Sequence, residues 1–168
     1  MASDERTARL ERWMLDYEND VLRLCYLYLN DLSLAEDALQ DTFLKVWRNM
    51  RHFQSRHGSS ARTWIMRIAI NTCKDYKRSA WLRHTDASRA PEDLPTAIQP
   101  VTETQRELFL DVLALPEKYR QVILLYYYQD MTMEETGKAL GISRPAVVRR
   151  LKKAYELLRY QPEGSDEG

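Results

Sequence analysis

The sequence predicts an all-α protein made of two small helical domains joined by a flexible linker. Proline and glycine are scarce, with six and five residues among 168, so few positions interrupt a helix. Apolar residues recur three and four positions apart over long stretches, which is the spacing of an amphipathic helix. A proline-containing stretch without this periodicity, residues 86–101, predicts the linker. We therefore expect domains at 1–85 and 102–160, and a disordered tail at 161–168.

The first domain should begin with a long helix, because an apolar stripe runs through residues 10–28. The Asn30-Asp31 pair then breaks the pattern. Ser33, followed three residues later by Glu36, predicts a capping box that opens a second helix through about Met50.

One stripe of this second helix mixes acidic and amide side chains with large aromatic ones. Its members, with their acidic neighbours, are Glu36, Asp37, Gln40, Asp41, Phe43 and Trp47. The stripe is either an exposed interaction surface or part of an ordinary amphipathic helix whose aromatic residues reach the core. The residues alone leave both interpretations open.

A polar loop, Gln54–Ser60, precedes a third helix that runs from about Ala61 to Arg78 or beyond. Residues 42–85 contain ten basic residues and one acidic residue, Asp75, a net charge of +9. The polar row of the helix consists of Arg67, Asn71, Lys74 and Arg78, with Asp75 beside it, and the interleaved aromatic residues are Trp64, Tyr76 and Trp81. This composition suits phosphate contacts and base stacking. A solvated cationic helix is the alternative, and the near absence of acids weakens it.

In the second domain, Thr102 and Gln105 predict a capping box for a helix through Leu113. Another helix should start at Leu115-Pro116. We expect its inward positions to be Tyr119, Val122, Ile123, Tyr126 and Tyr127.

Residues 131–158 predict two helices joined by a tight turn. Thr132 and Glu135 form a capping box, Gly141 ends the first helix and Ser143 caps the second. The second helix has a buried stripe at Val147, Leu151, Ala154 and Leu158, and its other faces carry Arg144, Arg149, Arg150, Lys152 and Lys153. A helix with this distribution suits the major groove of DNA, as in a helix-turn-helix. The alternative is a helical hairpin with a solvated basic face.

The formal net charge is zero, yet two basic blocks are divided by acidic segments, which suggests two nucleic-acid surfaces.

The residues argue against several classes of protein. Cys25 and Cys73 lack metal or redox spacing and are expected to be core residues. No signal peptide or membrane span is visible, so we expect a cytoplasmic protein. Motifs for catalysis, a metal or a cofactor are missing, which argues against an enzyme, and the histidines are expected to lie at the surface: His52, His57 and His84.

Three stretches, in this order, resemble the extracytoplasmic-function sigma factors of the sigma-70 family. AEDALQDTFLKVW, residues 35–47, resembles the polymerase-binding helix of region two. TWIMRIAINTCKDYKR, residues 63–78, is similar to the helix that opens and reads the minus-ten element. The stretch from LPEKYR to RRLKKA, residues 115–154, resembles region four, which reads the minus-thirty-five element.

The resemblance implies partners and sites. Core RNA polymerase would be bound by Glu36, Asp37, Gln40, Asp41, Phe43 and Trp47. The melted minus-ten strand would meet Trp64, Arg67, Asn71, Asp75 and Arg78, and the Gln54–Ser60 loop would hold a flipped base. The minus-thirty-five duplex would face Arg144, Arg149, Arg150 and Lys153. An anti-sigma factor, often membrane-anchored, would be a further partner, and no small-molecule substrate is implied.

The chain departs from the family pattern in its helix-turn-helix. Pro145-Ala146 stands where the family favours Gly-Thr, Val148 replaces a lysine, and Thr136-Gly137 replaces Ile-Ala. The competing function is a stand-alone helix-turn-helix regulator. Such a regulator would leave the first basic block and the acidic-aromatic helix without a role.

Overall fold

The computed structural model of the chain describes residues 2–53, 60–80 and 91–158. All regular secondary structure in these ranges is helical, as the sequence predicts. The chain divides into two compact units, Met1–Pro100 and Val101–Gly168.

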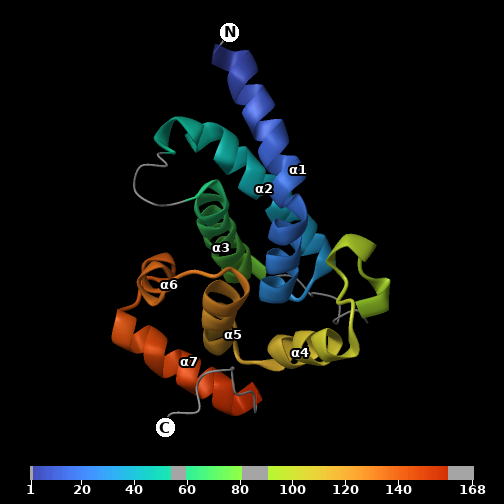
Figure 1. Ribbon diagram of the computed structural model, residues 1–168, viewed down its shortest axis with the longest axis vertical. Helices are drawn as coiled ribbons and strands as arrows, with labels where there is room; N and C mark the ends of the chain where they lie inside the picture. The colour runs from blue at the N-terminus through green and yellow to red at the C-terminus, as the bar shows by residue number, and fades with distance from the viewer. Residues whose placement is uncertain (1, 54–59, 81–90, 159–168) are drawn as a thin grey trace. The chain divides into compact units, whose positions relative to one another are not determined.

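Three helices form the first unit: α1 (Ala2–Leu29), α2 (Leu32–Asn49) and α3 (Ala61–Ala80). Each of the three packs against the other two, as Figure 1 shows. A short 3-10 turn, η1 (Met50–His52), follows α2. The core contains apolar side chains from every helix, among them Val21, Leu24, Tyr26, Tyr28, Ala38, Val46, Ile65, Met66 and Ile70. Because all three helices contribute to one core, the outward faces of α2 and α3 are held in fixed register.

The start of α2 corrects the sequence prediction, since Ser33 does not cap the helix. The N-cap is Asp31, whose carboxylate accepts a hydrogen bond from the backbone N–H of Leu34 at 2.9 Å. Asn30 has a left-handed backbone (φ 54°), which ends α1 and turns the chain at once into the new helix. Ser33 therefore lies inside the first turn, and Asp31, an equally good capping residue, takes its place.

The expected linker contains two 3-10 turns rather than an extended chain, η3 (Pro91–Asp93) and η4 (Thr96–Ile98). Proline has a fixed φ that suits the start of such turns. Leu94 and Ile98 are buried, and Arg23 of α1 donates a hydrogen bond to the carbonyl of Ala97 at 2.9 Å. The stretch from residue 91 to 100 therefore packs on the first unit. Residues 86–90 lie outside the described part of the chain.

The second unit contains α4 (Glu103–Ala114), α5 (Glu117–Val122), η5 (Ile123–Tyr128), α6 (Met133–Leu140) and α7 (Arg144–Leu158). The predicted capping boxes of α4 and α6 are both present. Arg120 is buried and donates hydrogen bonds to the carbonyls of Leu113 and Leu115 at 3.2 and 3.3 Å. These carbonyls lie at the end of α4, so one cationic side chain satisfies acceptors that the helix leaves without a backbone partner.

The segment η5 is a π-helix that continues α5. Val122 and Ile123 are buried as predicted, but Tyr127 is 37% exposed. The wider turn of a π-helix explains the difference, because it shifts the following side chains away from the three- and four-residue spacing of the prediction.

The turn between α6 and α7 has the predicted helix-turn-helix features. Gly141 ends α6 with φ 69°, a left-handed conformation that favours glycine. The hydroxyl of Ser143 accepts a hydrogen bond from the backbone N–H of Ala146 at 3.3 Å. A Cβ atom at Gly137 would lie 2.7 Å from the carbonyl oxygen of Ile142, so glycine allows the turn to approach α6 closely. The predicted stripe of α7 is buried at Val147, Leu151 and Ala154.

Candidate binding surfaces

The outward face of α2 combines acidic side chains with an apolar groove. Glu36, Asp37 and Gln40 are exposed. Beside them a groove of about 730 Å³ runs between α1 and α2. It is lined by Thr7, Leu10, Met14, Glu18, Leu39, Gln40, Phe43, Leu44 and Trp47. An apolar groove bordered by carboxylates is suited to a protein segment that carries apolar and basic side chains.

The two aromatic residues of the predicted stripe have different environments. Phe43 is only 5% exposed, so it belongs to the core as well as to the groove wall. Trp47 is half-buried, and the guanidinium of Arg6 stacks on its ring at 4.2 Å from the ring centroid. Arg6 also donates a hydrogen bond to the backbone carbonyl of Trp47. Phe43 thus reaches the core, whereas Trp47 keeps an accessible side, and the role of the stripe as an interaction surface stays a prediction.

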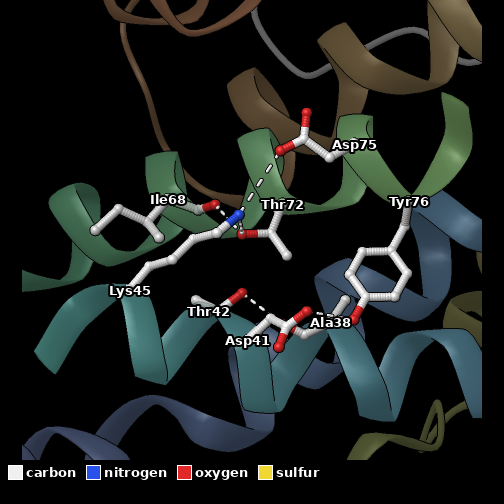
Figure 2. A network of polar contacts seen from close by, with 8 residues as sticks. All are labelled: Ala38, Asp41, Thr42, Lys45, Ile68, Thr72, Asp75 and Tyr76. Carbon is white, nitrogen blue, oxygen red and sulfur yellow. Dashed lines mark hydrogen bonds and ion pairs between the residues drawn. The ribbon is translucent and has the colours of Figure 1, made fainter. Parts of the chain in front are cut away.

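Asp41 does not share the outward direction of its predicted companions. Figure 2 shows its carboxylate accepting a hydrogen bond from the hydroxyl of Tyr76 on α3. One turn later on α2, the Lys45 ammonium lies 3.1 Å from the hydroxyl of Thr72 and 3.7 Å from the carboxylate of Asp75. These contacts tie α2 to α3. The sequence does not single out Lys45, because its partners are about thirty residues away.

The N-terminal half of α3 is anchored by an aromatic cluster. Trp64 is half-buried, and its ring lies 6.0 Å from that of Trp13 and 5.3 Å from that of Phe53. Ser60 caps the helix, because its hydroxyl accepts a hydrogen bond from the backbone N–H of Thr63 at 3.1 Å. Trp64 is therefore fixed by packing, with part of its side chain accessible.

The polar row of α3 follows this cluster. Arg67 is half-buried, whereas Asn71 and Asp75 are exposed. The side chain of Arg78 and residues 54–59 of the predicted base-binding loop lie outside the described parts of the chain. The described members of the row share one side of α3, so a single strand of nucleic acid can contact them together.

Basic side chains of α7 line a shallow pocket in the second unit. Arg144, Arg149 and Lys153 are exposed and Arg150 is half-buried. The pocket measures about 270 Å³ and is lined by Lys118, Tyr119, Ala146, Arg149, Arg150 and Lys153. Lys118 and Tyr119 belong to α5; the sequence prediction did not include Lys118 in the DNA-binding set, and it placed Tyr119 on the inward face. A signal was available, because Lys118 is one of only three basic residues between positions 108 and 142.

The described residues contain no cluster of three His, Cys, Asp or Glu side chains that could hold a metal ion. Cys25 and Cys73 are free and buried, as expected. A side-chain hydrogen bond with Cys25, together with burial, raises the pKa of the Cys73 thiol. Cys73 is therefore a protonated core residue rather than a nucleophile. No helix in the described ranges has the length and apolarity to cross a membrane.

Comparisons with known proteins agree on one family. The model of sigma-70 region 2 matches residues 13–83, and that of sigma-70 region 4 matches residues 113–160. The chain is 32% identical to the ECF RNA polymerase sigma factor SigL of Mycobacterium tuberculosis over 158 residues, which cover 90% of this chain and 88% of that protein. It is 34% identical to the RNA polymerase sigma factor CarQ of Myxococcus xanthus over 132 residues, with coverages of 76% and 74%.

Solved structures of similar fold include sigma factor RpoE of Bartonella quintana in complex with the anti-sigma factor NepR. It has a TM-score of 0.68 and 18% identity, and the match covers 89% of this chain and 93% of that one. The identities with SigL and CarQ extend over most of each protein, and the two family models match the two units in order. The chain therefore belongs to the extracytoplasmic-function sigma factors of the sigma-70 family, and it is an alternative sigma factor rather than a stand-alone helix-turn-helix regulator.

Proposed function

We propose that the chain binds core RNA polymerase through the outward face of α2 and contacts promoter DNA through α3 and α7. The first module would lie within residues 1–85 and the second within residues 102–160. The observation that carries the proposal is the separation of charge between surfaces. Acidic side chains border the α2 groove, whereas α7 exposes Arg144, Arg149 and Lys153, and the polar row of α3 includes the half-buried Arg67.

On α2, Glu36, Asp37 and Gln40 would make polar contacts with the polymerase while Trp47 fills an apolar contact beside them. Phe43 would support the groove from beneath, since it is almost fully buried. A central aromatic side chain surrounded by polar residues is the usual arrangement of a strong protein contact. Asp41 is a weaker candidate for this interface, because its carboxylate already accepts a hydrogen bond from Tyr76.

On α3, Arg67 and Arg78 would contact phosphates of the melted minus-ten strand, and Trp64 would offer a partly accessible ring for stacking. Asn71 and Asp75 would contact base edges, because both are exposed on the polar row. On α7, Arg144, Arg149, Arg150 and Lys153 would contact the minus-thirty-five duplex. Lys118 borders the same pocket, and we add it to this group.

Transcription by purified core polymerase tests the proposal, with and without the chain, on a library of random upstream sequences. The expected result is a set of selected promoters that share two elements at a fixed spacing, transcribed only when the chain is present. Transcription that is independent of the chain, or selection of a single duplex element, would contradict it. A promoter selected in this way also supplies the DNA for finer tests.

We also propose that a protein inhibitor controls the chain in the cytoplasm by covering the α2 face or the α7 helix. RpoE, whose fold is similar, was solved with an anti-sigma factor, which supports a partner of this class. No catalytic role is expected, so inhibition would act by occlusion. An inhibitor of this kind should compete with core polymerase for the chain. Simultaneous binding of both at undiminished affinity would refute occlusion.

A further inference from the structure

The contact between α2 and α3 includes two polar links that are one helical turn apart. The hydroxyl of Tyr76 donates to the carboxylate of Asp41, and the Lys45 ammonium donates to the hydroxyl of Thr72 at 3.1 Å. Asp41 and Lys45 are four residues apart on α2, as Thr72 and Tyr76 are on α3, so each pair shares one helix face. Figure 2 shows both links bridging the two helices. A slide of α3 by one turn would break both.

The Lys45 link is well defined by its surroundings. Thr72 is fully buried, and its hydroxyl donates to the carbonyl of Ile68 at 2.8 Å. The hydroxyl hydrogen is therefore in use, and the oxygen is left to accept from Lys45. The ammonium is thus held on one side by a buried oxygen and lies 3.7 Å from the Asp75 carboxylate on the other.

Asp75 occupies an unusual position for a carboxylate. It is the single acidic residue of the basic stretch 42–85, its side chain is 62% exposed, and it follows the exposed Asn71 by one turn. A carboxylate on a surface that meets DNA repels nearby phosphates. It can nevertheless accept a hydrogen bond from the exocyclic amino group of a base. Asp75 can serve such a base only where its charge is compensated.

We propose that Lys45 is a positioning residue of the minus-ten surface. It compensates the charge of Asp75 and fixes α3 on α2, so that the carboxylate can face an amino-bearing base of the melted strand without repelling the backbone. This inference rests on the proposed function and extends it. Lys45 lies on α2, the helix that we assign to polymerase binding. The inference gives it a role in the DNA-binding site on α3, although Lys45 itself need not touch DNA.

The test uses the holoenzyme assembled from core polymerase and full-length chain. The DNA is a promoter selected by the wild-type holoenzyme and held open over the minus-ten element by mismatches. The variants are Lys45→Met, Asp75→Asn and the two combined. Lys45→Met should weaken DNA binding by about tenfold, because it removes the cation that lies 3.7 Å from the Asp75 carboxylate and so leaves the site more negative. The double variant should bind DNA within about threefold of Asp75→Asn alone, and therefore more tightly than Lys45→Met. This recovery of affinity should shrink at high salt, because salt screens the repulsion between Asp75 and the phosphates.

Two further variants serve as controls. Arg48→Met removes one positive charge from an exposed site on the same helix, and its smaller loss should not be rescued by Asp75→Asn. Lys45→Arg keeps the charge and should retain near-normal binding, which keeps the test decisive even if Lys45→Met folds poorly. Equal losses for Lys45→Met and Arg48→Met without rescue would overturn the inference. So would a loss of polymerase affinity with DNA binding unchanged. Failure of the wild-type chain to select a promoter would instead overturn the proposed function, and this inference with it.

Discussion

Truncation of two aromatic residues in the α2 groove distinguishes the interface from the core. Trp47 is half-buried and stacks against Arg6, whereas Phe43 is 5% exposed and lines the same groove. Trp47→Ala should therefore act mainly on polymerase binding, and Phe43→Ala mainly on the stability of the fold. The two variants are matched in residue class and in position on the helix.

The structure gives an expected magnitude for each effect. Trp47→Ala removes a cation–π contact of about 0.5–1 kcal/mol together with part of the buried indole surface, so the free energy of unfolding should fall by about 1–2 kcal/mol. The loss of a central interface tryptophan typically costs about 2 kcal/mol or more in binding, which corresponds to roughly a 30-fold rise in Kd. Phe43→Ala empties a core site and should lower the free energy of unfolding by about 3–5 kcal/mol.

Urea unfolding and titration of labelled chain with core polymerase measure the two quantities. Asp41 is kept intact in this test, because its substitution would also remove the hydrogen bond that Tyr76 donates to it. The reasoning fails if Trp47→Ala leaves the Kd unchanged, or if it destabilises the chain as much as Phe43→Ala does. An unchanged Kd would move the polymerase contact away from Trp47, and an equal loss of stability would assign Trp47 to the core.

Three other predictions follow from the structure. Gly141→Ala should lower the free energy of unfolding by about 1 kcal/mol because φ is 69°, and Gly141→Asn should cost less; equal stability of the three proteins in urea would refute this. Arg149→Ala should weaken binding to the minus-thirty-five duplex by about 1–3 kcal/mol, and by different amounts for different DNA sequences. Lys153→Ala should weaken binding to all sequences equally and lower the slope of log binding constant against log salt concentration by about one. If both variants lose the same affinity on every sequence, α7 contacts only the phosphates and reads no bases. The raised pKa of Cys73 means that the folded state binds the thiol proton more tightly than the unfolded state does. The free energy of unfolding should therefore decline as pH rises above about 8.5, where the unfolded thiol loses its proton. An alkylating reagent should modify the buried thiol only when the chain unfolds.

The features that sequence analysis predicted best depend on short-range chemistry. The capping boxes at Thr102 and Thr132 and the glycine at position 141 each involve atoms within a few residues of one another. Such signals are visible in the sequence because no distant contact is needed to produce them. The predicted N-cap of α2, Ser33, was wrong for a related reason. Both Asp31 and Ser33 can cap a helix, and the choice depended on where α1 ends, which its packing determines.

Periodicity predicted which positions of a helix are apolar, but not which neighbour each polar position faces. Asp41 has the same residue type as the exposed Asp37 and lies one turn away from it, yet it turns toward α3. Its partner Tyr76 is 35 residues away, so the pairing depends on how the two helices cross. Tyr127 shows the same limit, since the π-helix changes the spacing on which the prediction relied.

The charge pattern contained more information about the site than the helix pattern did. A single acid among ten basic residues is unlike a solvated surface, where both signs mix. Such a carboxylate should lie near a cation, and Asp75 lies 3.7 Å from the ammonium of Lys45. Sequence alone offers ten candidate cations and cannot choose between them. The packing of α2 on α3 brings the side chain of Lys45 both to the buried hydroxyl of Thr72 and within 3.7 Å of the Asp75 carboxylate, a contact that the sequence does not reveal.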